Sequence, residues 1–126
     1  MEYKEYGSKN NDIIILLHGG GLSWWNYIDE ISLLENEFHI VIPILDGHSG
    51  SDTNFTSIES NTLEIINFIN KNYNGKVKLI GGLSLGGQIL LEILSTSILG
   101  SISRVRVIKS LSIIFSVRIL IINLLL

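Results

Sequence analysis

Cysteine is absent from this sequence, which excludes disulfide bonds, thiolate metal ligands and a cysteine nucleophile. An excess of positive charge is also absent: the formal net charge is −3, so the composition does not indicate a nucleic-acid-binding protein. Hydrophobic residues make up 46% of the chain, which is too many for an intrinsically disordered protein. What remains is a globular protein, and 126 residues form one domain at most.

Acidic residues and histidines are missing from the end of the chain. Residues 93–126 contain four basic residues and no Asp, Glu or His. All 12 acids lie in residues 1–92 together with five lysines, and the histidines are His18, His39 and His48. Because these histidines are far apart in the sequence and have no clustered acids beside them, we expect no metal site. We also expect no cofactor.

Neither end of the chain predicts a secreted or membrane protein. Residues 1–6 are polar and include two acids, which is untypical of a signal or transit peptide, so we expect a cytoplasmic location. Residues 111–126 are almost wholly apolar but short for a membrane span, and burying Arg118 near their middle would cost about 2.5–3.5 kcal/mol. We therefore predict no membrane partner and interpret this tail as an extra strand or a poorly packed, sticky segment.

Apolar runs rich in β-branched residues alternate with segments of helical periodicity. We predict buried strands at 13–17, 39–43 and 77–80, and a further strand at 105–111. We predict helices at 24–34 and 88–94, and between them a helix opened by Thr56 that ends near 72–75. Alternation of this kind predicts an α/β fold with a mostly parallel sheet that is flanked by helices and joined by right-handed crossovers. Tyr3 and Tyr6 are candidates for an edge strand that precedes these elements.

Local signals set the expected ends of these elements. Ser23 is the expected N-cap of the first helix, and Thr56 is the expected N-cap of the second, in a capping box with Glu59. Pro43 is expected to end its strand. We expect the two tryptophans that follow Ser23 to pack against the core rather than to line a pocket.

Ser84 lies in a Gly-x-Ser-x-Gly sequence between the strand at 77–80 and the helix that follows. A strand, this turn and a helix, in that order, favour a serine nucleophile, because the sharp turn pushes the hydroxyl out of the sheet. Gly82 and Gly86 permit the bend, since a side chain there would collide with the neighbouring strand or helix. The alternative is a glycine-rich turn with an incidental serine. Position 87 is Gly rather than Lys, which excludes a phosphate-binding loop, and no frame has the dinucleotide-binding glycine pattern.

Two further loops follow the other predicted strands. His18-Gly19-Gly20-Gly21 comes directly after the strand at 13–17, and its bare backbone N–H groups are able to approach a ligand closely. The alternative is a plain strand-to-helix turn. Asp46-Gly47-His48-Ser49-Gly50-Ser51 follows the next strand, and we expect it to leave the same edge of the sheet.

These three segments together resemble the α/β-hydrolase family over residues 12–95. The resemblance implies a partial α/β-hydrolase fold in which the first of the three clear strands lies between the other two. It implies that Ser84 is the nucleophile and that the Leu85 backbone N–H is one oxyanion-hole donor. Gly20 or Gly21 would supply the other donor. The family further implies a serine hydrolase that acts on a small-molecule ester or similar acyl substrate through an acyl-enzyme.

The family's order of nucleophile, acid and histidine cannot be completed after Ser84, since no acid follows Glu92 and no histidine follows His48. We therefore interpret residues 1–95 as the amino-terminal part of a hydrolase domain and residues 96–126 as a divergent or frame-shifted tail that is apolar and basic. Impaired hydrolase activity is expected. The alternatives are a non-catalytic binding module and an inactive fragment, and the sequence makes no prediction of the oligomeric state.

The three histidines have different expected roles. His18 belongs to the glycine run and is expected to order it through backbone hydrogen bonds. His39 begins a strand, so it is expected at the opposite edge of the sheet from the serine. His48 is the candidate substitute base, with Asp46 or Asp52 as its acid.

Overall fold

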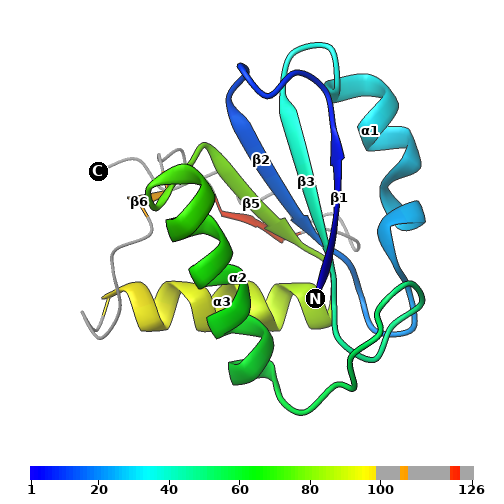
Figure 1. The fold of residues 1–126 in the computed structure, drawn as a ribbon, viewed down its shortest axis with the longest axis vertical. Coiled ribbons are helices and arrows are strands. Elements are labelled where there is room, and N and C mark those ends of the chain that lie inside the picture. Colours follow the sequence, from blue (N-terminus) through cyan, green and yellow to red (C-terminus); the bar gives the residue numbers. More distant parts are fainter. Residues whose placement is uncertain (99–105, 108–119, 123–126) are drawn as a thin grey trace.

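The computed structural model describes residues 1–98, 106–107 and 120–122, with side chains for residues 1–96 (Figure 1). The elements are β1 (Glu2–Tyr6), β2 (Ile13–Leu17), the 3-10 helix η1 (Trp24–Tyr27), α1 (Ile28–Leu34), β3 (His39–Ile44), α2 (Ile58–Tyr73), β4 (Lys76–Val77), β5 (Leu79–Gly82), α3 (Leu85–Ile98), β6 (Arg106–Val107) and β7 (Leu120–Ile122). Most of the strand expected at 105–111 lies outside the described residues. Within the described part, no helix has both the length and the hydropathy needed to cross a membrane.

The main sheet has the strand order β1-β3-β2-β5-β7 (Figure 1). Its three central strands are parallel, with β2 paired to β3 on one side and to β5 on the other. β1 and β7 pair antiparallel at the two ends of this order, while β4 and β6 form a separate small parallel pair. The predicted fold class is confirmed, and so are the central position of β2 and the edge strand that contains Tyr3 and Tyr6.

Alternate residues of β2 contribute to hydrophobic cores on the two faces of the sheet. Ile15 and Leu17 pack with the buried aliphatic residues of α2 and α3. Ile14 and Leu16 pack on the other face with Tyr27 of η1 and with α1. Figure 1 shows the same division, with α2 and α3 on one side of the sheet and α1 on the other. Burial on both faces explains why this strand is an unbroken aliphatic run.

The carboxyl ends of β2, β3 and β5 lie at one edge of the sheet, because the three strands are parallel neighbours. The glycine loop (residues 18–21) follows β2, the second loop (residues 45–57) follows β3, and the turn at Ser84 follows β5. The fold therefore gathers at one edge the three segments that the sequence singles out. This is the edge at which open α/β sheets bind ligands.

Two predicted strand boundaries were wrong. β3 continues through Pro43 to Ile44. The residues of β3 that pair with β2 end at Val41, before Pro43. The missing N–H of Pro43 therefore breaks no hydrogen bond between β3 and β2. The strand expected at 77–80 is divided into β4 and β5, because the chain changes partner there: β4 pairs with β6, whereas β5 pairs with β2.

The cap of α2 also differs from the prediction. Ser57, rather than Thr56, is the N-cap, and its hydroxyl accepts a hydrogen bond from the Ser60 N–H at 3.0 Å. The backbone of Ser57 is extended, which is the conformation that an N-cap adopts. The capping interaction was thus expected one residue too early in the chain.

The first helical segment begins as a 3-10 helix, which changes the roles of the residues around it. Ser23 precedes η1, but its hydroxyl makes no cap bond and instead donates to the Ser49 carbonyl at 2.7 Å. Trp24 packs against the core as expected, whereas Trp25 is 45% exposed. The expectation for Trp25 was wrong because a 3-10 helix does not keep the α-helical period of 3.6 residues.

Candidate active site

Ser84 lies in a sharp turn between β5 and α3, which are separated by Leu83 and Ser84 alone. Its backbone φ is +51°, in the left-handed region that costs a non-glycine residue about 1–2 kcal/mol. The Leu83 N–H donates to the Leu17 carbonyl at 3.0 Å, and the Gly86 N–H donates to the Leu83 carbonyl at 2.8 Å. These bonds hold the strained turn in place. The Ser84 side chain is left exposed at the edge of the sheet.

Close backbone contacts explain the glycines on either side of Ser84. A Cβ at Gly86 would lie 2.1 Å from the Leu17 carbonyl oxygen, and one at Gly82 would lie 2.3 Å from the Gly86 carbonyl oxygen. Backbone atoms cannot rotate out of the way, so neither position accepts a side chain without movement of α3 or β2. A Cβ at Gly87, by contrast, would have its nearest neighbour at 3.6 Å. The first turn of α3 is therefore packed directly on the end of β2.

The glycine loop runs beside this turn. A Cβ at Gly19 would lie 3.4 Å from the Leu83 carbonyl oxygen, and one at Gly20 would lie 3.9 Å from the Leu85 Cβ. Among the described residues, no acceptor binds the N–H of Gly20 or Gly21. Leu85 is the first residue of α3, where a backbone N–H has no acceptor within the helix. Unpaired N–H donors from two segments thus lie close to Ser84.

His18 is fully buried, and both of its ring nitrogens are engaged. The Leu45 N–H donates to Nε2 at 3.1 Å, so Nδ1 carries the proton and donates to the Gly19 carbonyl at 3.0 Å. Burial lowers the pKa of the ring, the bond to Gly19 opposes that shift, and nearby His48 adds to it. His18 is therefore neutral and joins the glycine loop to the start of the second loop. The expectation that it orders the glycine loop is confirmed.

His48 is half-buried in the second loop. Its Nδ1 donates to the Asp46 carbonyl at 3.0 Å, and its ring meets the His18 ring edge to face with the centroids 5.1 Å apart. The Asp46 carboxylate is engaged elsewhere, since it accepts from the Thr53 hydroxyl and lies 3.7 Å from the Met1 ammonium. Asp52 is exposed. Among the described residues, neither carboxylate is hydrogen-bonded to the His48 ring.

The Ser84 hydroxyl makes no hydrogen bond to any described residue, so no histidine is in place to take its proton. His48 lies at the correct edge of the sheet, and its bond from Nδ1 to the Asp46 carbonyl leaves the Nε2 lone pair unused, but its ring is not hydrogen-bonded to Ser84. Its role as a substitute base stays a prediction. The structure thus brings together the serine and the unpaired backbone donors, without a bonded base.

Comparison with protein families gives the same answer as the fold. Residues 12–113 match the family described as alpha/beta hydrolase fold. The chain belongs to the α/β-hydrolase family. The match includes residues on both sides of the boundary that we placed at residue 95, and that boundary stays a prediction.

Solved structures of several hydrolases contain a similar fold. A protein from Desulfitobacterium hafniense that is assigned to the α/β-hydrolase family has a TM-score of 0.68 and 24% identity, over 73% of this chain and 38% of that one. A protein from Acinetobacter baumannii assigned as a lipase has a TM-score of 0.66 and 28% identity, over 75% and 32%. The enol-lactonase from Burkholderia xenovorans has a TM-score of 0.62 and 20% identity, over 70% and 35%. This chain therefore spans about a third of the length of each.

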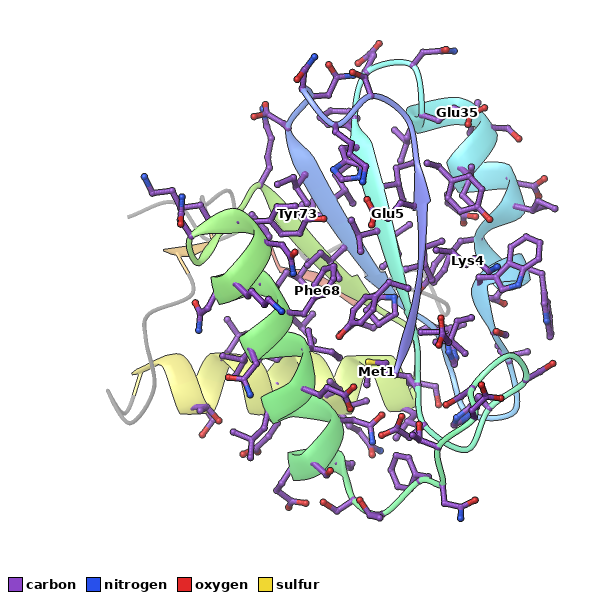
Figure 2. All side chains as sticks on the ribbon, in the orientation of Figure 1. Met1, Lys4, Glu5, Glu35, Phe68 and Tyr73 are labelled. Atoms are coloured by element: carbon purple, nitrogen blue, oxygen red, sulfur yellow. The ribbon has the colours of Figure 1, made fainter. Side chains whose placement is uncertain are left out.

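His39 lies at the opposite edge of the hydrolase sheet, as expected. It is the first residue of β3 and is registered with Ile13, the first residue of β2. Its Nε2 is 2.8 Å from the Glu5 carboxylate, and its ring meets Tyr73 edge to face. Figure 2 shows Glu5 on β1 and Tyr73 on α2, both on this part of the molecule. His39 therefore has a structural partner and no contact with the candidate site.

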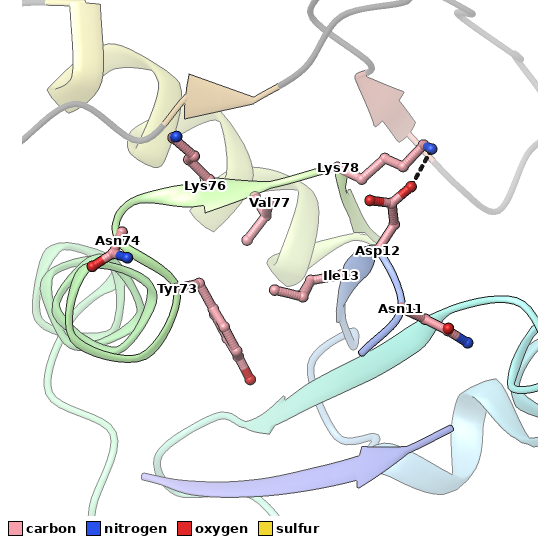
Figure 3. A pocket seen from close by; sticks show the side chains of 8 residues that line it. All are labelled: Asn11, Asp12, Ile13, Tyr73, Asn74, Lys76, Val77 and Lys78. Carbon is pink, nitrogen blue, oxygen red and sulfur yellow. Dashed lines mark hydrogen bonds and ion pairs between the residues drawn. The ribbon is translucent and has the colours of Figure 1, made fainter. Parts of the chain in front are cut away.

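A shallow hollow of about 330 Å³ opens at the same amino-terminal edge (Figure 3). An ion pair between Lys78 and Asp12 lies on its wall. The residues around it are Asn11, Asp12, Ile13, Tyr73, Asn74, Lys76, Val77 and Lys78. Because this hollow is at the far end of the parallel strands from Ser84, it is not part of the candidate active site. Within the described residues, no group of three or more His, Cys, Asp or Glu side chains is arranged to hold a metal ion.

Two contacts at the site were not predicted from the sequence. The hydroxyl of Tyr27 donates to the Leu17 carbonyl at 2.9 Å, and that of Ser23 donates to the Ser49 carbonyl at 2.7 Å. Both acceptors are backbone atoms of other segments, the end of β2 and the second loop, which the fold brings next to η1. No pattern in the sequence indicates such a bond, because every residue has a backbone carbonyl and the acceptor therefore does not depend on the residue type. The segment after the glycine loop is thus bonded to the end of β2 and to the second loop of the candidate site.

Proposed function

We propose that this α/β hydrolase acts on a carboxylic ester or a similar small acyl substrate through an acyl-enzyme on Ser84. The observation that carries the proposal is the backbone of Ser84: a φ of +51° at an exposed strand-to-helix turn, enclosed by glycines that have no room for a Cβ. A strained turn of this kind presents a serine hydroxyl as a nucleophile. The similarity to a lipase and to an enol-lactonase supports the choice of an acyl substrate.

The oxyanion hole is proposed to form from the backbone. The N–H of Leu85, the residue after Ser84, supplies one donor, and the N–H of Gly20 or Gly21 supplies the other. A Cβ at Gly20 would lie 3.9 Å from the Leu85 Cβ, and none of these N–H groups has an acceptor among the described residues. Each donor of this type contributes about 10²–10³-fold to the rate by stabilising the negative oxygen of the tetrahedral intermediate. These donors need no particular side chain, which is why Leu at position 85 is compatible with the role.

The proposed reaction has two steps. The Ser84 oxygen attacks the carbonyl carbon of the ester and loses its proton, which gives a tetrahedral intermediate. The C–O bond to the alcohol then breaks, and the departing alkoxide takes up one proton and leaves as the alcohol. Water then attacks the acyl-enzyme, releases the carboxylic acid and returns a proton to Ser84. A base accelerates both steps, because a neutral hydroxyl is a weak nucleophile.

The weak point of the site is this base. The lone pair of His18 Nε2 is already used by the Leu45 N–H. His48 donates from Nδ1 to the Asp46 carbonyl, which leaves a lone pair on Nε2, but among the described residues no hydrogen bond joins this ring to the Ser84 hydroxyl. In a serine protease, loss of the histidine alone costs about 10⁶ in kcat, which is about 8 kcal/mol. We therefore propose a slow reaction for these 126 residues, limited by proton transfer rather than by the position of the nucleophile.

A non-catalytic binding role is the second candidate. It is favoured by the combination of a free Ser84 hydroxyl with unpaired backbone N–H donors, which together match a carboxylate or a carbonyl group. This role predicts that small carboxylates raise the melting temperature without being turned over. Melting temperatures that do not change with the carboxylate concentration would contradict it.

A fluorophosphonate probe tests the proposed nucleophile. The expected result is slow covalent labelling of the folded wild-type protein, measured by intact mass spectrometry, and no labelling of Ser84→Ala. Ser95→Ala is the matched control, because Ser95 is an exposed serine on the same helix, α3, but outside the strained turn. Labelling that survives in Ser84→Ala, or that depends equally on Ser95, would refute Ser84 as the nucleophile.

A further inference from the structure

The carbonyl oxygen of Leu17 lies where the glycine loop and the Ser84 turn meet. It accepts one hydrogen bond from the Leu83 N–H at 3.0 Å and another from the Tyr27 hydroxyl at 2.9 Å. A carbonyl oxygen has two lone pairs, so both are used. Gly86 also packs against this oxygen, since a Cβ there would be 2.1 Å away. The Leu17 carbonyl is therefore a point at which β2, η1, the Ser84 turn and the first turn of α3 meet.

Tyr27 is a rigid donor to this oxygen. Its side chain is 1% exposed and is packed in the core with Ile14, Ile31 and Ile40. The hydroxyl has to donate, because a carbonyl oxygen only accepts. Burial raises the pKa of the phenol well above its ordinary value, and Glu30 adds to that shift. The phenol therefore keeps the proton that it donates at neutral pH.

We propose that Tyr27 is a positioning residue for the oxyanion hole, an inference that rests on the proposed function of Ser84. The peptide between Leu17 and His18 leads directly into the glycine loop. When its carbonyl is held on both sides, the orientation of this peptide is set, and with it the path of the loop. The Tyr27 hydroxyl thus controls how the donors of the glycine loop lie relative to the Leu85 N–H of α3.

The magnitude of the effect follows from the precision that the oxyanion hole requires. A displacement of about 1 Å at a catalytic group can cost about 10²-fold in rate. In Tyr27→Phe the Leu17 carbonyl keeps its bond to Leu83, so the loop is released on one side only. We expect a smaller loss, of about tenfold, in the rate of the covalent step. A hydrogen bond with a purely structural role would lower the stability of the protein and leave the rate of the folded protein unchanged.

The experiment compares Tyr27→Phe with Tyr3→Phe in the full chain. Tyr3 is the matched control, because its ring stacks on Phe68 and its buried hydroxyl has no hydrogen-bond partner among the described residues. Fluorophosphonate labelling at several probe concentrations separates the maximal rate, kinact, from the binding constant, KI. We expect Tyr27→Phe to lower kinact about tenfold with KI unchanged, and Tyr3→Phe to change neither.

Amide NMR spectra supply a readout that does not depend on activity. In Tyr27→Phe the amide signals of Gly19, Gly20 and Gly21 are expected to shift, and in Tyr3→Phe they are expected to stay in place. Normal kinact in Tyr27→Phe would overturn the positioning role while leaving the proposed function of Ser84 intact. Failure of the wild type to be labelled would overturn the proposed function of Ser84. In that case the NMR spectra still test the positioning role, and unchanged glycine signals in Tyr27→Phe would overturn it.

Discussion

Replacement of Gly86 by alanine is the strongest test of how the Ser84 turn is packed. The added Cβ would lie 2.1 Å from the oxygen and 2.6 Å from the carbon of the Leu17 carbonyl, and 2.8 Å from the His18 carbonyl oxygen. All three are backbone atoms at the end of a strand that is buried on both faces. The clash can be relieved only if α3 or the glycine loop moves. The substitution is therefore expected to damage both the stability and the site.

The expected magnitude combines two effects of opposite sign. Overpacking of a rigid site costs about 1–3 kcal/mol, and a contact this short belongs at the upper end of that range. Alanine in place of glycine in a helix gains up to about 1 kcal/mol. The net expectation for Gly86→Ala is a loss of about 2 kcal/mol in the free energy of unfolding. For Gly87→Ala, where the nearest atom is 3.6 Å from the added Cβ, the expectation is a gain of up to about 1 kcal/mol.

Urea unfolding followed by circular dichroism measures both variants. Because the two glycines are adjacent in the same helix, their difference isolates the contact with Leu17 from the helix propensity of alanine. The midpoints are expected to move in opposite directions, with the m value unchanged. Equal midpoints for Gly86→Ala and Gly87→Ala would show that α3 does not pack on the end of β2 in the way described.

Two other predictions concern the loops of the site. Burial lowers the pKa of His18 below its ordinary value of 6.5, so on acidification the unfolded chain binds the proton first. Its contribution to the free energy of unfolding is present above that ordinary value and is lost as the pH falls toward the lowered pKa. As the pH is lowered through 6.5, the urea midpoint of the wild type is therefore expected to fall more steeply than that of His18→Asn. Equal dependence of the two midpoints on pH would contradict this. Ser23→Ala is expected to cost about 1 kcal/mol by removing the bond to the Ser49 carbonyl, and an unchanged midpoint would contradict that role.

Much of the fold could be predicted because its signals are local. The aliphatic run of β2 indicates a strand buried on both faces, and the alternation of strands with helices indicates parallel neighbours. The glycines around Ser84 were predicted for the same reason, since a sharp strand-to-helix turn needs them wherever it occurs. The structure then supplied their physical cause, the contacts of Gly82 and Gly86 with neighbouring backbone atoms.

Features that depend on distant backbone atoms could not be predicted in this way. Ser23 was expected to cap a helix, and its hydroxyl instead binds the second loop at Ser49. Tyr27 has the spacing of an ordinary core residue, yet its hydroxyl reaches the Leu17 carbonyl. The division between β4 and β5 depends on β6, far along the chain. In each case the partner is a carbonyl or a strand whose position is set by the tertiary fold.

The central claim is our proposal that Ser84 is a nucleophile beside backbone oxyanion donors, and that no base among the described residues is hydrogen-bonded to it. Added imidazole supplies a base from solution, so the rate of hydrolysis of p-nitrophenyl acetate, measured against imidazole concentration, tests the claim directly. The rate for Ser84→Ala is subtracted, because imidazole also cleaves this ester without the protein. The expected result is a Ser84-dependent rate that is low without imidazole and rises as imidazole is added. A Ser84-dependent rate that is absent at every imidazole concentration, or high and insensitive to it, would contradict the claim.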